Sequence, residues 1–122
     1  MDFTYEELVA DEDIQDVLDR RLHLAIEICI DIASHIAAAL SLPGRESASD
    51  VFEVLGKNGI IPEKLAKVFS KQIVGFRNIL VHEYLDIDHT LVFKNYKKDL
   101  QDLREFAKAV VIFLEKNPQL TV

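Results

Sequence analysis

Residues that break helices or cross-link chains are scarce in this sequence. It has four glycines and three prolines in 122 residues, and this scarcity favours long helices over many turns. Cys29 is the only cysteine, which excludes an intramolecular disulfide, and no Cys/His cluster has zinc-ligand spacing. Because Cys29 lies within the apolar stretch 26–30, we expect a buried, unreactive thiol.

Long apolar runs and an excess of positive charge are also missing. No basic segment followed by an apolar stretch opens the chain, and its apolar runs fall far short of the roughly 20 residues of a membrane span. We therefore expect a cytoplasmic protein with no membrane partner. The net charge of −7 argues against broad, nonspecific nucleic-acid binding, which needs a basic surface. It leaves room for a small basic pocket on an acidic body.

Hydrophobic residues make up 49% of the chain, enough for the core of one domain over residues 1–122. Their spacing of three and four, without strand-like alternation, predicts an all-α antiparallel bundle of four to five helices with no sheet. Four predicted helices cover 11–42, 47–57, 62–84 and 88–116.

The ends of these helices have recognisable signals. Residues 1–10 read as a lead-in that allows one helical turn, with Thr4 and Glu7 in the form of a capping box. Pro43-Gly44 and Asn58-Gly59 predict helix ends, Pro62 suits a first helical position, and 117–122 reads as a frayed tail. The inward stripes predicted for the two longest helices are Ile14, Leu18, Leu22, Ala25, Cys29, Ile32, Ile36 and Leu40, then Val92, Tyr96, Leu100, Leu103, Ala107, Val110 and Leu114.

One segment, residues 75–84, combines residues suited to chemistry. Arg77 offers a planar fork for a phosphate oxygen, and His82 titrates near neutral pH and can transfer protons. Together they could cleave RNA without a metal, the 2′-hydroxyl attacking the adjacent phosphate while Arg77 stabilises the phosphorane. Asn78 could orient the histidine or the phosphate. The plainer alternative is an arginine on the surface of a helix end and a histidine that covers the bundle.

Helix geometry constrains that hypothesis. Residues seven apart, such as Arg77 and Tyr84, share a face of a regular helix, and so do Asn78 and His82, four apart. Arg77 and His82, by contrast, diverge by about 140°. A second copy across a two-fold axis would close this gap and would supply two histidines, one as base and one as acid.

The string Arg77-Asn78-Ile79-Leu80-Val81-His82-Glu83-Tyr84 resembles the Arg-x4-His-x-Tyr signature of the HepT branch of the HEPN superfamily. Residues 24–33 resemble the long-helix segment of that family, and Gly75-Phe76 and the connector 86–88 also fit. The resemblance covers roughly residues 5–115. The full Arg-Asn-x-x-Val-His-x-Tyr string is a specific signal, whereas Arg-x4-His by itself would be a weak one.

The resemblance implies a HEPN-type helical bundle that forms a two-fold homodimer, with the paired motifs facing a cleft. It implies a metal-independent endoribonuclease toxin without a cofactor, in which Arg77, His82 and Asn78 are catalytic. The substrate would be an RNA, with tRNA among the candidates. It also implies an MNT-type nucleotidyltransferase antitoxin as partner, which transfers AMP to Tyr84.

Several other residues have competing interpretations. Asp31, in the segment that matches the family, could support the site or pair with His35, or it could be solvated. Glu27 and Asp31 could form a carboxylate pair for a metal, but no Glu-x-x-His motif accompanies them, so we expect no metal.

A rival function also stands beside the ribonuclease. In it the chain is a noncatalytic helical subunit that presents substrate or nucleotide to a nucleotidyltransferase, which suits the acidic charge. His23 and His89 read as ordinary solvated residues. The lysines 94, 97 and 98 read as a solvated helix face or as a phosphate-steering patch.

Overall fold

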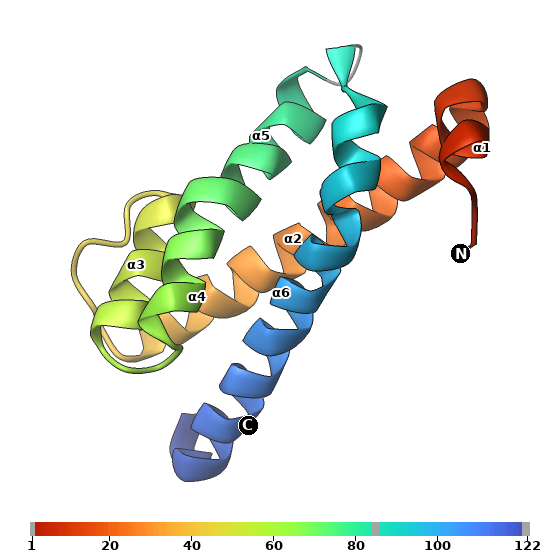
Figure 1. Cartoon of the computed structure of the whole chain (residues 1–122). Helices are drawn as coiled ribbons and strands as arrows, with labels where there is room; N and C mark the ends of the chain where they lie inside the picture. The colour runs from red at the N-terminus through yellow and green to blue at the C-terminus, as the bar shows by residue number, and fades with distance from the viewer. Residues whose placement is uncertain (1, 84–85, 121–122) are drawn as a thin grey trace.

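The computed structural model describes residues 2–83 and 86–120, and within these ranges the chain is helical with no strand. Figure 1 shows two long crossing helices with shorter ones packed around them. The all-helical prediction is confirmed. The elements are α1 (Tyr5–Ala10), α2 (Glu12–Ala39), α3 (Ala48–Lys57), α4 (Glu63–Val68), the π-helical turn η1 (Phe69–Ile73), α5 (Val74–His82), α6 (His89–Lys116) and the 3-10 turn η3 (Pro118–Leu120).

Side-chain caps fix where the helices begin. Thr4 and Glu7 form the expected capping box, in which each side chain accepts a hydrogen bond from the other residue's backbone N–H. Asp11, Ser47 and Asp88 cap α2, α3 and α6 through their side-chain oxygens. These starts agree with the sequence-based boundaries, because a side-chain cap is a local signal.

The end of α2 differs from the prediction. The helix stops at Ala39 rather than near Leu42, since Ser41 adopts a left-handed φ of 53° that a helix cannot continue through. Pro43-Gly44 therefore follows the end of the helix and does not cause it.

Helix α2 is the centre of the fold and contacts α1, α3, α5 and α6. α5 returns along α2, and a short connector then reverses the chain into α6, so that α5 and α6 lie side by side in Figure 1.

By length and composition α2 is also the one helix in the described part of the chain that could cross a membrane. Its apolar residues are interrupted by charged ones, so the lengths of the apolar runs do not indicate this. Its contacts on several sides are those of the core helix of a folded domain.

The core has two parts. In the larger, Phe52, Phe69 and Phe106 pack with ring centroids 4.6, 5.2 and 5.6 Å apart. Gly56 lets α3 approach α4, because a Cβ there would lie 2.5 Å from the Cβ of Ala66. The smaller part joins α1 and the start of α2 to α5 and α6, and consists of Leu8, Leu18, Leu22, Leu80 and Val92.

The predicted inward stripes were partly wrong. Ile32 and Ala107 are exposed, whereas Ile26 and Phe106, absent from the stripes, are fully buried. The physical reason lies in the neighbours of the long helices. α2 is covered by α1 and α6 on some stretches and by α3 and α5 on others, so its buried side does not follow one straight stripe.

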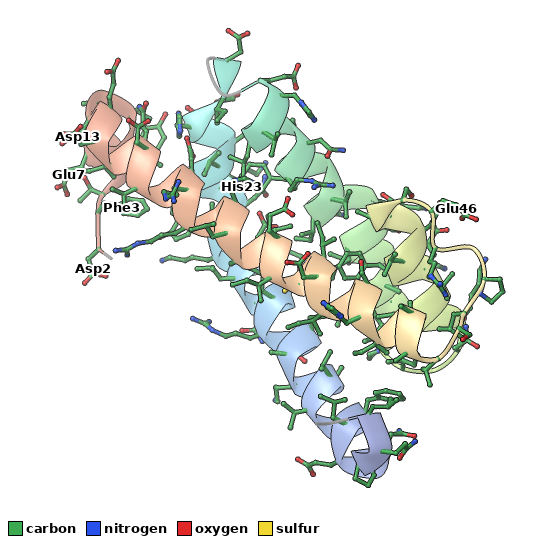
Figure 2. The ribbon with its side chains drawn as sticks, turned by 180° about the vertical axis from the view of Figure 1, so that it is seen from behind. Asp2, Phe3, Glu7, Asp13, His23 and Glu46 are labelled. Carbon is green, nitrogen blue, oxygen red and sulfur yellow. The ribbon has the colours of Figure 1, made fainter. Side chains whose placement is uncertain are left out.

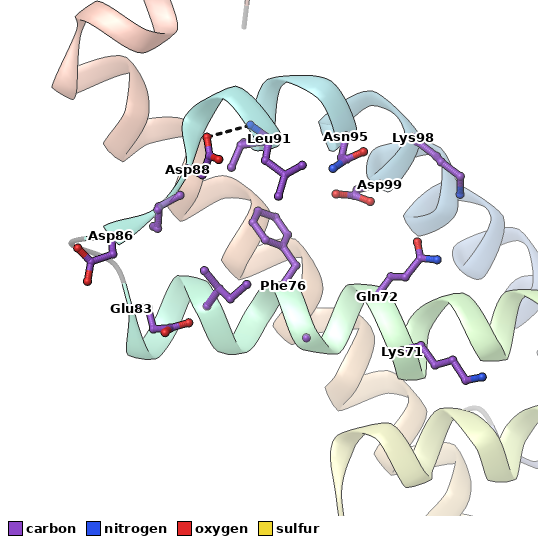
Figure 3. Close-up of a pocket in the computed structure, with 14 residues that line it drawn as sticks. Lys71, Gln72, Phe76, Glu83, Asp86, Asp88, Leu91, Asn95, Lys98 and Asp99 are labelled. Atoms are coloured by element: carbon purple, nitrogen blue, oxygen red, sulfur yellow. Dashed lines mark hydrogen bonds between the residues drawn. The ribbon is translucent and has the colours of Figure 1, made fainter.

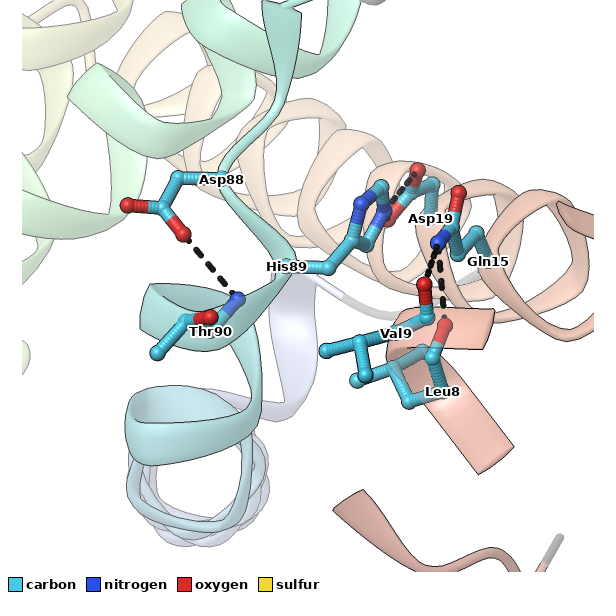
Figure 4. Close-up of polar contacts among 7 residues, drawn as sticks. All are labelled: Leu8, Val9, Gln15, Asp19, Asp88, His89 and Thr90. Atoms are coloured by element: carbon cyan, nitrogen blue, oxygen red, sulfur yellow. Dashed lines mark hydrogen bonds and ion pairs between the residues drawn. The ribbon is translucent and has the colours of Figure 1, made fainter. Parts of the chain in front are cut away.

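Residues 2–10 contain the short helix α1 and pack against both long helices. Leu8 is fully buried, the Tyr5 hydroxyl lies 2.9 Å from the Thr90 hydroxyl, and the Phe3 ring packs 5.4 Å from that of Tyr96. Gln15 donates from α2 to the carbonyl of Leu8 at the end of α1 (Figure 4). Helix α1 is therefore tied to both long helices. At the other terminus, Pro118–Leu120 form a 3-10 turn.

Candidate active site

The helix that carries the candidate site is not regular, which the sequence did not predict. Between α4 and α5 the chain makes the π-helical turn η1, in which the Val74 N–H donates to the Phe69 carbonyl, five residues back. The Ser49 hydroxyl of α3 donates to the Ser70 carbonyl inside this turn at 2.9 Å. Such turns depart from the α-helical pairing of amides with carbonyls, so this side-chain donor supports the altered backbone.

The π-helical turn determines which way Arg77 faces. In a regular helix Phe69 and Arg77 would point about 80° apart. A π turn takes up about one additional residue, which brings Arg77 to within about 20° of the side occupied by the buried Phe69. As a result Arg77 faces α2 and is half-buried.

On α2 the partner of Arg77 is Glu27. The Arg77 Nη1 donates to the Glu27 Oε1 at 2.8 Å, and the His23 Nε2 lies 3.4 Å from the same oxygen. The side chains of Arg77, Glu27 and His23 are 23%, 33% and 35% exposed. The buried Arg77 Nε has no hydrogen-bond partner among the described residues. The guanidinium is thus held in one place with part of its surface open.

His82 and Asn78 lie on the outer side of α5. His82 is the last residue of α5, and both side chains are exposed. No hydrogen bond or ion pair joins either of them to Arg77 within the described residues. A single copy of the chain therefore presents the cation and the proton carrier on different sides of one helix, as the 140° divergence predicts.

Tyr84, expected to accept AMP, lies outside the described residues. A shared face with Arg77 requires a helix that continues to Tyr84, but α5 ends at His82. The prediction of a regular helix over 62–84 was wrong on this point and on the π turn. The described residues that flank this gap, Glu83 and Asp86, are exposed.

The remaining sequence candidates have varied surroundings. Asp31 and His35 are exposed, and no ion pair between them occurs among the described residues. Lys98 pairs with Asp102 at 3.0 Å. Cys29 is buried, and burial raises the pKa of its thiol to about 11, which agrees with the expected unreactive thiol.

Two contacts were missed by sequence reasoning. His89 is not solvated: its Nε2 lies 2.9 and 3.1 Å from the two carboxylate oxygens of Asp19, which ties the start of α6 to α2 (Figure 4). Burial raises the pKa of Asp19, and the bond to His89 opposes that shift. His23, expected to be solvated, likewise pairs with Glu27, expected at most to be a metal ligand. Their spacing of four on one helix was the available signal.

One apolar surface adjoins the candidate site. Leu24, Ile28 and Ile32 are exposed and follow one another at helical spacing along α2, the helix that lies in front in Figure 2. On α5, Val81 is also exposed. We call Leu24, Ile28 and Ile32 the α2 stripe. An exposed row of this kind beside polar functional groups is typical of an interface.

Comparison with known proteins agrees with this fold and motif. The model of the family described as ribonuclease HepT-like matches residues 1–110. The mRNA nuclease HepT of Shewanella oneidensis is 33% identical over 97 residues, which cover 80% of this chain and 72% of that protein. The tRNA nuclease HepT of Aphanizomenon flos-aquae is 34% identical over 98 residues, 80% of this chain and 66% of its own length.

A solved structure shows the same arrangement of helices. The tri-AMPylated Shewanella oneidensis HEPN toxin in complex with MNT antitoxin superposes with a TM-score of 0.79 at 31% identity, over 87% of this chain and 79% of the other. Fold and motif thus define a HEPN-type helical protein. The chain belongs to the ribonuclease HepT-like family. The family resemblance stated from the sequence is confirmed, and so, at the level of the family, is the expectation of an endoribonuclease.

Proposed function

We propose that this protein is the metal-independent endoribonuclease toxin of a cytoplasmic toxin–antitoxin pair. The observation that carries the proposal is the Arg77 guanidinium, held by Glu27 at 2.8 Å with part of its surface open, on the helix that ends in the exposed His82. A fixed cation and a nearby proton carrier are what transfer at an RNA phosphate requires. Glu27 engages only Nη1, which leaves Nη2 for a phosphate oxygen.

In the proposed reaction the RNA supplies its own nucleophile. One His82 removes the proton of a 2′-hydroxyl, and the oxygen attacks the adjacent phosphorus. Arg77 stabilises the negative charge of the phosphorane, and Asn78 orients the phosphate. The bond to the 5′-oxygen breaks as a second His82 protonates it, leaving a 2′,3′-cyclic phosphate and a 5′-hydroxyl. Every step uses protein groups and substrate atoms, so no metal is needed.

The second His82 implies a two-fold homodimer. Within one copy, Arg77 faces α2 and His82 points outward about 140° away. The α2 stripe lies beside Glu27 on the same helix, and Ile28 is 58% exposed. A second copy packed there would cover the stripe and bring its own His82 toward the Arg77 of the first, which the isolated chain does not do.

The dimer has a matched test. Ile28→Asp should give a monomer in analytical ultracentrifugation and should abolish RNA cleavage. Val111→Asp, at the similarly exposed Val111 on α6, should leave both unchanged. A monomeric native chain that cleaves RNA at full rate would contradict the composite site.

Control of the toxin would act through Tyr84. In this proposal the hydroxyl attacks the α-phosphate of ATP on an MNT-type nucleotidyltransferase, forming a phosphodiester to AMP and releasing pyrophosphate. Support comes from the Shewanella toxin, which is tri-AMPylated and in complex with MNT antitoxin. The adduct adds a negative charge two residues beyond His82 in the sequence, where it would repel RNA phosphate.

The decisive experiment is an RNA cleavage assay with purified protein in excess EDTA. We expect cleavage to persist, to produce cyclic phosphate ends, and to disappear in His82→Ala while circular dichroism stays unchanged. His82 is exposed, so its truncation opens no core cavity. If the native chain does not cleave RNA but binds a nucleotidyltransferase, the noncatalytic subunit replaces the toxin as the function.

A further inference from the structure

A cleft of about 610 Å³ lies between α5 and the first half of α6 (Figure 3). One wall runs from Lys71 in η1 through α5 to Glu83, and the other runs from Asp88, the cap of α6, to Asp99. Neither Arg77 nor His82 lines it. The cleft is therefore distinct from the proposed catalytic groups, although it uses the same helix.

The floor of the cleft is apolar. Phe76 and Leu91 approach each other from the two helices in Figure 3. Ile79 and Leu91 are 39% and 52% exposed, which is unfavourable for aliphatic side chains in water. Two adjacent helices with such stripes form a groove that accepts the apolar face of a third helix. The wall from Lys71 to Glu83 is about 18 Å long, or about three helical turns.

The charges of the cleft select the chemistry of its occupant. Glu83, Asp86 and Asp88 surround one end, and Asp99 stands on the α6 wall (Figure 3). Burial raises the pKa of Asp99, and no hydrogen bond or ion pair of its carboxylate is found within the described residues. The lysines of the cleft are Lys71 and Lys98, and Lys98 is neutralised by Asp102. This excess of carboxylates repels RNA and favours a cationic partner.

We infer that the cleft between α5 and α6 is the docking groove for a basic, amphipathic helix of the nucleotidyltransferase partner. This inference rests on the proposed function. The partner has to reach Tyr84, and both Glu83, one residue before it in the sequence, and Asp86, two residues after it, line the cleft. A second copy of this acidic chain already has its own candidate surface, the α2 stripe on another helix. The apolar floor would anchor the docked helix, and the carboxylates would fix its direction.

Two matched substitutions on α6 test the groove. Leu91 lines the cleft, whereas Val111 lies twenty residues further along the same helix and outside it, and their exposed fractions are 52% and 53%. Titration calorimetry of the full chain with the purified nucleotidyltransferase should show a loss of affinity of roughly tenfold or more for Leu91→Lys. Val111→Lys should change the affinity by less than about twofold.

The competing outcomes are distinguishable. Equal affinities of the two variants would overturn the inference. So would a loss of RNA cleavage in Leu91→Lys, which would make the cleft part of the RNA site, or a change in its sedimentation without partner, which would make the occupant a second copy. If the native chain fails to cleave RNA while Leu91→Lys still weakens binding, the proposed activity fails but the groove stands.

Discussion

The two sides of α5 differ in nearly every physical respect. Toward α2 the helix presents one cation, Arg77, held by one carboxylate, with an apolar row alongside. Toward α6 it borders a cleft with an apolar floor and a surplus of carboxylates. On α5 itself the two sides lie close together in sequence, with Arg77 facing α2 and Phe76 and Ile79 lining the cleft, because neighbours in a helix point about 100° apart. A single short helix can therefore serve phosphate chemistry on one side and protein recognition on the other.

The difference between the two sides also explains how an acidic protein can act on RNA, which is itself negatively charged. A net charge of −7 argues against general affinity for RNA, but the chemistry needs a cation at one point only. The acidic residues near the end of α5 lie on the cleft side. An acidic protein of this kind would bind RNA weakly outside its site and would attract a basic partner strongly.

The largest effect is expected at Tyr84, which follows α5 in the sequence. Tyr84→Phe keeps the ring but removes the acceptor oxygen, so AMP transfer should be lost completely. Binding of the nucleotidyltransferase through the cleft should persist. Intact-mass spectrometry after co-expression measures the first, and calorimetry the second. A Phe variant that gains the same mass as the native chain would show that the acceptor lies elsewhere.

A loss of about 10²–10³-fold in cleavage rate is expected for Arg77→Ala, the usual cost of removing one group that stabilises an oxyanion. Arg77→Lys keeps the charge without the planar fork and should recover part of that rate. Neither variant should weaken binding to the partner by more than about twofold, since Arg77 does not line the cleft. An equal loss in both assays would mean that the two sides are not independent.

Glu27→Gln should have a smaller effect on the same side. The residue touches Arg77 and not the proposed substrate, so it acts as a positioning residue, and the Glu27 side chain is one third exposed. Partly exposed pairs contribute about 1 kcal/mol at most, which corresponds to a roughly fivefold loss in kcat/KM. A less well held guanidinium should lower kcat more than it raises KM. Glu27→Asp, which retains the charge, should cost less, and an unchanged kcat in both would remove Glu27 from the site.

The smallest effect is on the cleft side and concerns stability. The pKa of Asp99 is raised by burial and by Asp102, so the folded state favours the protonated form. The protonated Asp99 carboxyl therefore adds to the free energy of unfolding below the ordinary carboxyl pKa. This stabilisation is lost as the pH rises through the raised pKa. Asp99→Asn should therefore raise the melting temperature at pH 7, by an amount that shrinks toward pH 3. A lower melting temperature at pH 7 would contradict this.

Most of the fold could be predicted because its signals are local. The capping box of Thr4 and Glu7, the cap at Ser47 and the spacing of apolar residues gave the helices and their starts. The exposure of Ile32 could not be predicted, because it depends on which helices cover each stretch of α2.

The candidate site also has one part that could be predicted from the sequence and one part that could not. The motif residues Arg77, Asn78 and His82 were recognisable because the full string resembles the HepT signature, and their roles remain a proposal. The pairing of Arg77 with Glu27 and of His89 with Asp19 joins residues 50 and 70 positions apart. No periodicity encodes such contacts, and none encodes the π turn that makes the first of them possible.

That turn also means that the chain is about one residue longer than a regular helix between the same two ends would be. Shortening it by one exposed residue, Lys71, could relax η1 into an ordinary helical turn while Phe69 and Arg77 keep their positions. Deleting one residue from α6, which contains no π turn, would rotate all the following side chains of that helix by about 100° about its axis. We therefore expect single-residue insertions and deletions in this family to be tolerated best within Phe69–Ile73, just before the proposed catalytic residues.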